Sequence, residues 1–231
     1  MLVAAGILIF ICLLGSMPAI CQNNEPETRT YEIGEFTELF LEGAYGVELI
    51  QGNSSALQVQ ASDARAFDYL KISNRGDLLH LHVDRKLFDF SRITLYLTFE
   101  NLERLRIYGS IRLETRGYLD LDDLDMLVEG GARVTLKAKA KQINLENKGG
   151  VLVELMGVAD VLNMRMAGAG HINAGELRAN EVDFRIDGVG TGKVFATDKL
   201  NATIKGAGKI NYLGDPEITQ TIDGIGSVTR D

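Results

Sequence analysis

The chain has 231 residues, which is enough for one sizeable core or one elongated repeat structure, and its formal net charge is −8. With no cluster of Lys and Arg to offset that charge, we exclude a nucleic-acid partner. The 25 glycines, the 3 prolines and the absence of tryptophan suit tight corners between many short strands.

Residues 1–21 contain no charged side chain and form an apolar run with a small-residue exit. This is typical of a signal peptide, with Ala19 and Cys21 at the small positions before a cut at Gln22. We therefore expect an exported protein of the periplasm or cell surface, with no membrane span after signal removal. A membrane anchor and a lipid on Cys21 are the alternatives. The lipid is disfavoured because Ile20 stands where a lipoprotein signal needs a small residue.

Both cysteines, Cys12 and Cys21, fall in the predicted signal, so the mature chain would have no disulfide and no cysteine metal site. We predict a linker over residues 22–30 and one domain over residues 31–231. Its first part, residues 31–100, contains a strand–corner–strand unit around Gly43, followed by extended runs separated by polar turns. We interpret it as an N-terminal rung with a β excursion that covers the first edge, because an open edge exposes unpaired backbone.

Residues 101–231 repeat one theme of alternating apolar residues, a glycine corner and another strand start. The spacings between successive corners are 21, 19, 19, 20, 18 and 18 residues, and the corners begin at Gly109, Gly130, Gly149, Gly168, Gly188, Gly206 and Gly224. Apolar residues stand four and two places before the corners and four after them, which is strand periodicity, with one exception in seven in each column. The exceptions are Gln220, Asn147 and Gly192. A period near 20 indicates stacked units. We predict an all-β fold, a single-stranded right-handed parallel β-helix (β-solenoid) with an N-terminal β cap.

The last four corners are Gly-x-Gly, and we expect their glycines to serve structure rather than ligand binding. They tolerate positive φ and let adjacent turns approach closely. A dinucleotide-binding loop would need a third glycine and a following helix, whereas each corner here runs into a β-like segment. The predicted structural corners are Gly168, Gly170, Gly188, Gly190, Gly206, Gly208, Gly224 and Gly226.

The serial Gly-x-Gly corners are flanked by two further signatures, Phe99–Gly109 before the first corner and Tyr212-Leu-Gly-Asp-Pro216 before the last. On these residues the chain, from about residue 31 to 228, resembles the family "putative auto-transporter adhesin, head GIN domain" of Bacteroidetes-type bacteria. The resemblance implies a pectin-lyase-like solenoid, a role in adhesion and no catalytic set. Three early corners depart from the pattern, at Gly109, Gly130 and Gly149.

Outward columns beside the corners predict paired charges rather than a catalytic cluster. The expected vertical pairs are Glu129 with Lys148, Glu146 with Arg165, and Asp187 with Lys205 and Asp223. A second column predicts a stacked amide ladder that satisfies the bends, made of Asn144, Asn163, Asp183 and Asn201. A polysaccharide lyase would instead crowd carboxylates around calcium, beside an unpaired basic residue. We predict no catalytic, cofactor-binding or metal residues.

Three smaller signals favour structural readings. His80 and His82 share one strand face, but no third zinc ligand lies nearby in sequence, so we interpret them as surface residues. The acidic turn lacks the glycine and the bidentate Glu of a calcium loop, and comprises Asp120, Asp122, Asp123 and Asp125. The tripeptide Arg75-Gly-Asp77 matches integrin-binding adhesins, yet its context predicts a hairpin turn.

Two functions remain open. One is a non-catalytic exported binding module, an adhesin, whose partner is a polysaccharide or another cell-surface ligand. The alternative is a carbohydrate-active enzyme, a lyase or hydrolase, on the same solenoid. Outward aromatics for stacking on sugars, such as Tyr45, Tyr108 and Tyr118, are few and scattered, so we name none of them as a site. At the C-terminal edge, Arg230 and Asp231 protect the last strand by charge, or that edge self-associates with another chain.

Overall fold

A computed structural model describes residues 26–84 and 92–231. The predicted signal peptide, Cys21 and the first part of the predicted linker lie outside the described residues. The described chain is all-β, with 74% of the described residues in strands and about seven solenoid turns. Among the described residues, no helix is long and apolar enough to cross a membrane.

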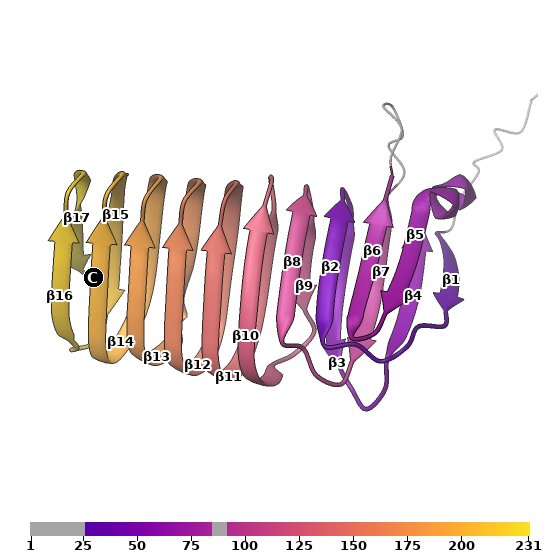
Figure 1. Ribbon diagram of the computed structural model, residues 1–231, viewed down its shortest axis with the longest axis horizontal. Helices are drawn as coiled ribbons and strands as arrows, with labels where there is room; N and C mark the ends of the chain where they lie inside the picture. Colours follow the sequence, from indigo (N-terminus) through magenta and orange to yellow (C-terminus); the bar gives the residue numbers. More distant parts are fainter. Residues whose placement is uncertain (1–25, 85–91) are drawn as a thin grey trace, which may run out of the picture.

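The molecule is a flattened coil with two parallel β faces (Figure 1). We call the face toward the viewer in Figure 1 the front face and the other the back face. The front face is built, in spatial order, from β5 (Leu70–Arg75), β6 (Leu78–Val83), β2 (Glu38–Gly43), β8 (Arg104–Gly109), the final segments of β10 (Leu119–Glu129), β11 (Arg133–Asn147), β12 (Gly150–Met166), β13 (Ala169–Ile186) and β14 (Val189–Ile204), and β16 (Glu217–Ile222).

The back face carries the complementary strands. In spatial order they are β1 (Glu27–Tyr31), β4 (Ala56–Ala61), β7 (Ile93–Phe99), β3 (Gly46–Gln51), β9 (Arg112–Thr115), the first segments of β11 to β14, β15 (Ala207–Leu213) and β17 (Ile225–Arg230). The chain rises along the front face, crosses at the glycine corners and descends along the back (Figure 1). This is the predicted right-handed β-solenoid.

The N-terminal part forms the end of the coil. β2 and β3 make one rung, and the chain then leaves to form β4, the 3-10 helix η1 (Ala64–Tyr69) and β5. It returns as β6 and β7, which pair in parallel with the outer sides of β2 and β3. β5 and β4 then pair antiparallel with β6 and β7. The excursion thus covers the first edge, where parallel pairing ends.

Side chains alternate along every strand, so each rung sends one set inward and the other outward. The inward residues of the two faces form one continuous core, with fully buried members such as Leu81, Leu113 and Ile204. Asn147 is the buried polar member of an apolar column. Its Oδ1 accepts from Gly149 N at 2.8 Å and its Nδ2 donates to Ala169 O at 3.4 Å, so its polar atoms are satisfied.

Close approach of successive turns explains the first glycine of each corner. A methyl group added at Gly188 would fall well inside the van der Waals contact of the Gly168 carbonyl oxygen, and the same clash recurs from one corner to the next. Gly188 does not have a positive φ, in contrast to Gly109 and Gly130. Corner-to-corner packing, rather than left-handed backbone, is therefore the common reason for glycine in this column.

Candidate functional site

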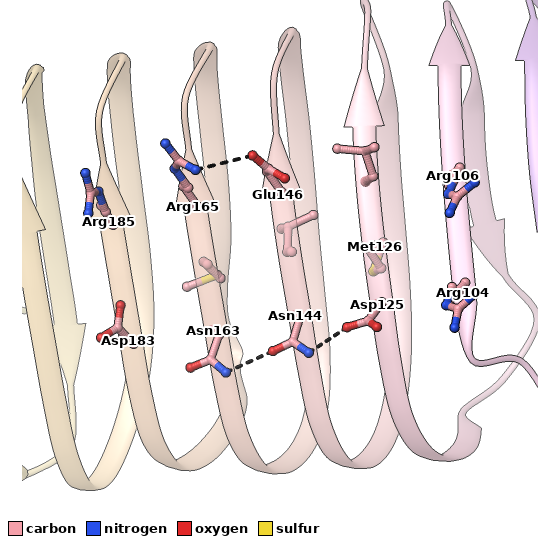
Figure 2. Close-up of a pocket in the computed structure, with 13 residues that line it drawn as sticks. Arg104, Arg106, Asp125, Met126, Asn144, Glu146, Asn163, Arg165, Asp183 and Arg185 are labelled. Carbon is pink, nitrogen blue, oxygen red and sulfur yellow. Dashed lines mark hydrogen bonds and ion pairs between the residues drawn. The ribbon is translucent and has the colours of Figure 1, made fainter.

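The outward side chains of the front face stack in two rows along the solenoid axis, because neighbouring rungs are in register (Figure 2). We call them the amide row and the arginine row. The amide row consists of Arg104, Asp125, Asn144, Asn163 and Asp183. The arginine row consists of Arg106, Leu127, Glu146, Arg165 and Arg185. Together they line a groove of about 630 Å³ that runs across β8 and β10 to β13.

Hydrogen bonds connect neighbouring rungs along part of the amide row. Asn163 Nδ2 donates to Asn144 Oδ1 at 2.9 Å, and Asn144 Nδ2 donates to Asp125 Oδ1 at 2.6 Å (Figure 2). The predicted ladder is therefore confirmed between Asn144 and Asn163 and also includes Asp125. Asp183 and Asn201 continue the row in register, with no ladder hydrogen bond in the described chain. These bonds join side chains of neighbouring rungs and do not reach the backbone of the bends, so that part of the prediction is wrong.

Two of the expected charge pairs form across rungs. Lys148 Nζ lies 3.4 Å from Glu129 Oε1, and Arg165 Nη1 lies 3.6 Å from Glu146 Oε1. These pairs are solvent-exposed, so each stabilises the fold by at most about 1 kcal/mol. The paired side chains are already neutralised by each other, so they are less available to a charged ligand.

The expected pairing of Asp187 with Lys205 and Asp223 is wrong. Asp187 instead accepts hydrogen bonds from Arg165 Nε at 2.9 Å and from Arg185 Nε at 2.6 Å, because both guanidiniums reach it from the arginine row. Partial burial raises the pKa of the Asp187 carboxyl, but the two guanidiniums outweigh it and hold the pKa below its usual range. A carboxylate held in its charged form by two partners is poorly suited to act as a general acid.

The end of the groove at β8 has a different character. Arg104 Nη1 pairs with Glu38 Oε1 at 2.5 Å, whereas Arg106 has no ion pair or side-chain hydrogen bond within the chain that the structure describes. Tyr108 follows Arg106 on the same outward face and is 53% exposed. The groove lining holds four arginines against three carboxylates, although the protein is acidic as a whole. A free guanidinium beside an exposed ring can bind an anionic group.

The expectation that Tyr45 faces outward is wrong, because its side chain is buried in the core. Its hydroxyl donates to Leu81 O at 2.7 Å, and burial raises the pKa of the phenol. Tyr108 and Tyr118 are exposed as predicted. They lie on different parts of the coil, so they form no common aromatic platform.

The structure brings His80 and His82 together with a residue that the sequence analysis missed. β2 pairs with β6 in a register that places Glu42 opposite His82, and Glu42 Oε2 lies 3.0 Å from His80 Nε2. The absence of a nearby third ligand in sequence was therefore misleading, because Glu42 is 38 residues away along the chain. Only the pairing register of β2 with β6 could have identified Glu42 as the third member of the cluster.

The other two small motifs have structural partners. The predicted acidic turn is wrong, because its four aspartates lie within strand β10. Asp122 pairs there with Lys141 at 2.6 Å, and Asp125 belongs to the amide row. The predicted hairpin turn is confirmed, since Gly76 and Asp77 connect β5 to β6 and Gly76 has a φ of 56°. The second glycines of the predicted corners approach the preceding turn as the first ones do, since a methyl group added at Gly190 would clash with the Gly170 carbonyl oxygen.

Comparison with known proteins places this geometry in a family. Residues 35–216 match the model of the family described as "Putative auto-transporter adhesin, head GIN domain". A comparison with curated proteins finds no match.

Several solved structures share the fold. A "putative adhesin" from Bacteroides fragilis superposes with a TM-score of 0.79 at 25% identity, covering 90% of this chain and 97% of that one. A "putative lipid binding protein" from Parabacteroides distasonis gives a TM-score of 0.65 at 24% identity, with coverages of 90% and 98%. A "putative adhesin" from the same organism gives 0.69 at 19% identity, also with coverages of 90% and 98%. The last two likenesses concern the fold alone.

Proposed function

The chain belongs to the head GIN domain family, and on that premise we propose that it is an exported, non-catalytic binding module that holds an acidic polysaccharide strand along the front-face groove. The observation that carries this proposal is the free Arg106 guanidinium beside Tyr108 at one end of a polar groove. The name of the family and that of the similar adhesin from Bacteroides fragilis support a role in attachment.

The shape of the groove supports a linear ligand. It follows one row of strands across four rung-to-rung steps, which span roughly 19 Å at about 4.8 Å per step. The amide row offers donors and acceptors to hydroxyl groups, and Arg106 of the arginine row offers its free guanidinium to a carboxylate or sulfate. Sparse aromatic side chains favour charge and hydrogen bonds over ring stacking as the means of binding.

The alternatives have less support from the geometry. A carbohydrate-active enzyme would need a carboxyl available for proton transfer, and Asp187 is held charged by Arg165 and Arg185. A lipid ligand would need an apolar cavity, and the space between the two faces is filled by buried side chains.

Binding assays on the purified protein test this function. Isothermal titration with uronate-bearing and sulfated polysaccharides, compared with neutral ones, should show binding to acidic chains alone. Arg106→Ala should weaken that binding roughly tenfold. Arg133→Ala is the matched control, because Arg133 is an exposed arginine of β11 on the back face.

Two results would contradict the proposal. Equal affinity of the Arg106→Ala and Arg133→Ala proteins would remove the groove as the binding site. Shortened polysaccharide or unsaturated products after incubation would establish the enzyme alternative, above all if Asp187→Asn or Asp223→Asn abolished them.

The location is tested separately. Intact-mass measurement on protein from the native host should show removal of residues 1–21, because the apolar run and the small residues Ala19 and Cys21 predict that cut. A chain that still contains Met1 would contradict export by this signal. A cut before Cys21 with added acyl mass would establish the lipoprotein alternative.

A further inference from the structure

A cluster of potential metal-binding side chains lies on the front face, where the N-terminal excursion meets the rung formed by β2 and β3. It consists of Glu42 from β2 with His80 and His82 from β6, two strands that lie side by side (Figure 1). The two histidines alternate with buried leucines and so point outward together, and Glu42 points the same way from the neighbouring strand. None of these residues belongs to the groove proposed for polysaccharide binding.

The three side chains converge on one point. Glu42 Oε2 lies 3.0 Å from His80 Nε2 and 3.1 Å from His82 Nδ1, and one ligand atom from each residue lies within 4.8 Å of the others. A tetrahedral zinc ion with bonds of about 2.0–2.1 Å holds its ligand atoms roughly 3.3 Å apart. The carboxylate oxygen therefore lies within about 0.3 Å of the spacing from both nitrogens that one bound ion would impose.

One nitrogen in the cluster is without a hydrogen-bond partner. His82 Nδ1 is shielded from solvent and forms no hydrogen bond, although it lies 3.1 Å from the Glu42 carboxylate. Buried polar atoms are almost always hydrogen-bonded, so an exception calls for a physical explanation. A metal ion between this nitrogen and Glu42 would supply the missing partner.

The surroundings orient the site and leave it accessible. Phe40 stacks on the His80 ring with centroids 4.5 Å apart and planes 12° apart, which fixes the direction of the imidazole. The cluster opens into a hollow of about 400 Å³, where Lys71 and Arg75 are the cationic neighbours. The Lys71 ammonium lies 3.4 Å from Asp84, so this carboxylate partly balances its charge.

We propose that Glu42, His80 and His82 bind one divalent transition-metal ion of the zinc class. Two imidazoles and one carboxylate suit such ions, whereas calcium and magnesium favour sites made of oxygen ligands. Three protein ligands leave a coordination position for water or for an oxygen donor from a partner. Because the ligands come from β2 and β6, the ion links the N-terminal excursion to the rung formed by β2 and β3.

Metal titration tests this site directly. The full chain, expressed without a polyhistidine tag and stripped with a chelator, should bind one equivalent of Zn²⁺ by isothermal titration. Binding should raise its melting temperature. Co²⁺ should give the visible absorption of a low-symmetry site with nitrogen ligands. Ca²⁺ should neither bind in the titration nor raise the melting temperature.

Variants identify the ligands. Glu42→Gln and His82→Ala should each weaken Zn²⁺ binding at least about tenfold and abolish the rise in melting temperature. His171→Ala is the matched control, since His171 is an exposed histidine of β13 that contacts Thr191. Circular dichroism without metal checks that each variant folds, and Glu42→Gln preserves the size of the side chain if His82→Ala does not fold.

The proposal is overturned if the stripped protein binds no Zn²⁺. It is also overturned if Glu42→Gln and His82→Ala bind as tightly as the unmodified protein, or if His171→Ala loses binding to the same extent. Polysaccharide binding is measured separately and does not decide the outcome, because the metal site lies outside the groove.

Discussion

The two ends of the solenoid use the same repeat but bury it differently. At the N-terminal end, β4 to β7 cover the first rung, and core residues such as Leu81 and Leu95 are fully buried. At the other end, every residue of β16 is exposed, and Ile225 of β17 is 80% exposed. The same column position can therefore be core or surface. Burial in a solenoid depends on the presence of a neighbouring rung as well as on the residue's own place in the repeat.

The largest effect is expected from placing a charge in one column at different distances from the open end. Ile107, Ile204 and Ile222 occupy the same position two places before a corner, but the first two are buried and Ile222 is 41% exposed. Ile107→Asp and Ile204→Asp should lower the free energy of unfolding by more than about 4 kcal/mol, because an unpaired carboxylate enters the core. Ile222→Asp should cost less than about 1.5 kcal/mol.

Urea unfolding followed by circular dichroism provides the measurement. Equal damage from Ile204→Asp and Ile222→Asp would show that the open end is covered in solution. Sedimentation would then reveal whether a second copy covers it, as the expected self-association through this edge requires. A monomer with an insensitive Ile222 would support the contrast between the two ends.

An intermediate effect is expected at the corners. Gly188→Ala should lower the free energy of unfolding by about 1–3 kcal/mol, because the new methyl group would meet the Gly168 carbonyl and force adjacent turns apart. Gly224→Ala creates the same clash against Gly206, but only the last part of the coil must move. It should mainly speed hydrogen exchange in β17. Gly150→Ala is the control, since nothing lies within 4 Å of the added carbon.

The corner hypothesis fails if Gly188→Ala is as stable as Gly150→Ala. Hydrogen exchange that quickens uniformly in Gly224→Ala, rather than at β17, would show that disturbance at the open end spreads through the whole coil.

The smallest effect is expected from ion pairs and appears at acidic pH. Arg185 and Arg165 hold the pKa of Asp187 below its usual range in the folded chain, against a partial opposing effect of burial. Because the folded pKa lies below the unfolded value of about 3.9, the stabilisation is complete above about pH 5. It is lost as the pH falls through the folded pKa.

Melting curves between pH 7 and pH 2.5 measure this difference. The unmodified protein should be more stable than Asp187→Asn near neutral pH, and the gap should close under acid. Asp215→Asn removes a 91%-exposed partner of Arg230 near the open end and should change stability by less than about 0.5 kcal/mol. A gap for Asp187→Asn that widens towards low pH would contradict the sign of this argument.

The sequence was sufficient to predict the repeat architecture because each rung repeats its inward residues and corner glycines at a nearly fixed period. It also predicted the pairs Glu129–Lys148 and Glu146–Arg165, which depend only on adjacent repeats. It was wrong about Asp187, because two long arginine side chains compete with Lys205 for the same carboxylate. Column position does not determine which way a flexible side chain turns.

The Glu42–His80–His82 cluster lay beyond sequence analysis for another reason. One of its two strands, β6, belongs to the excursion, where the 20-residue period is lost. Only the pairing of β2 with β6 places Glu42 opposite His82. The repeat also indicates which residues share the outward columns that line the groove. It does not indicate that Arg106 lacks an ion-pair partner, because that depends on which neighbouring carboxylates reach its guanidinium.

The direction of the backbone ladders has a mechanical consequence. The strands lie across the long axis, so the hydrogen bonds between rungs run along it (Figure 1). A pull between the two ends would pass through every junction in series, and each junction would bear the full tension. Among the strands that the structure describes, β17 pairs with β15 alone, whereas β12 is paired on both sides. Under such tension the coil would peel rung by rung from its open end, and its weakest junction would set its strength.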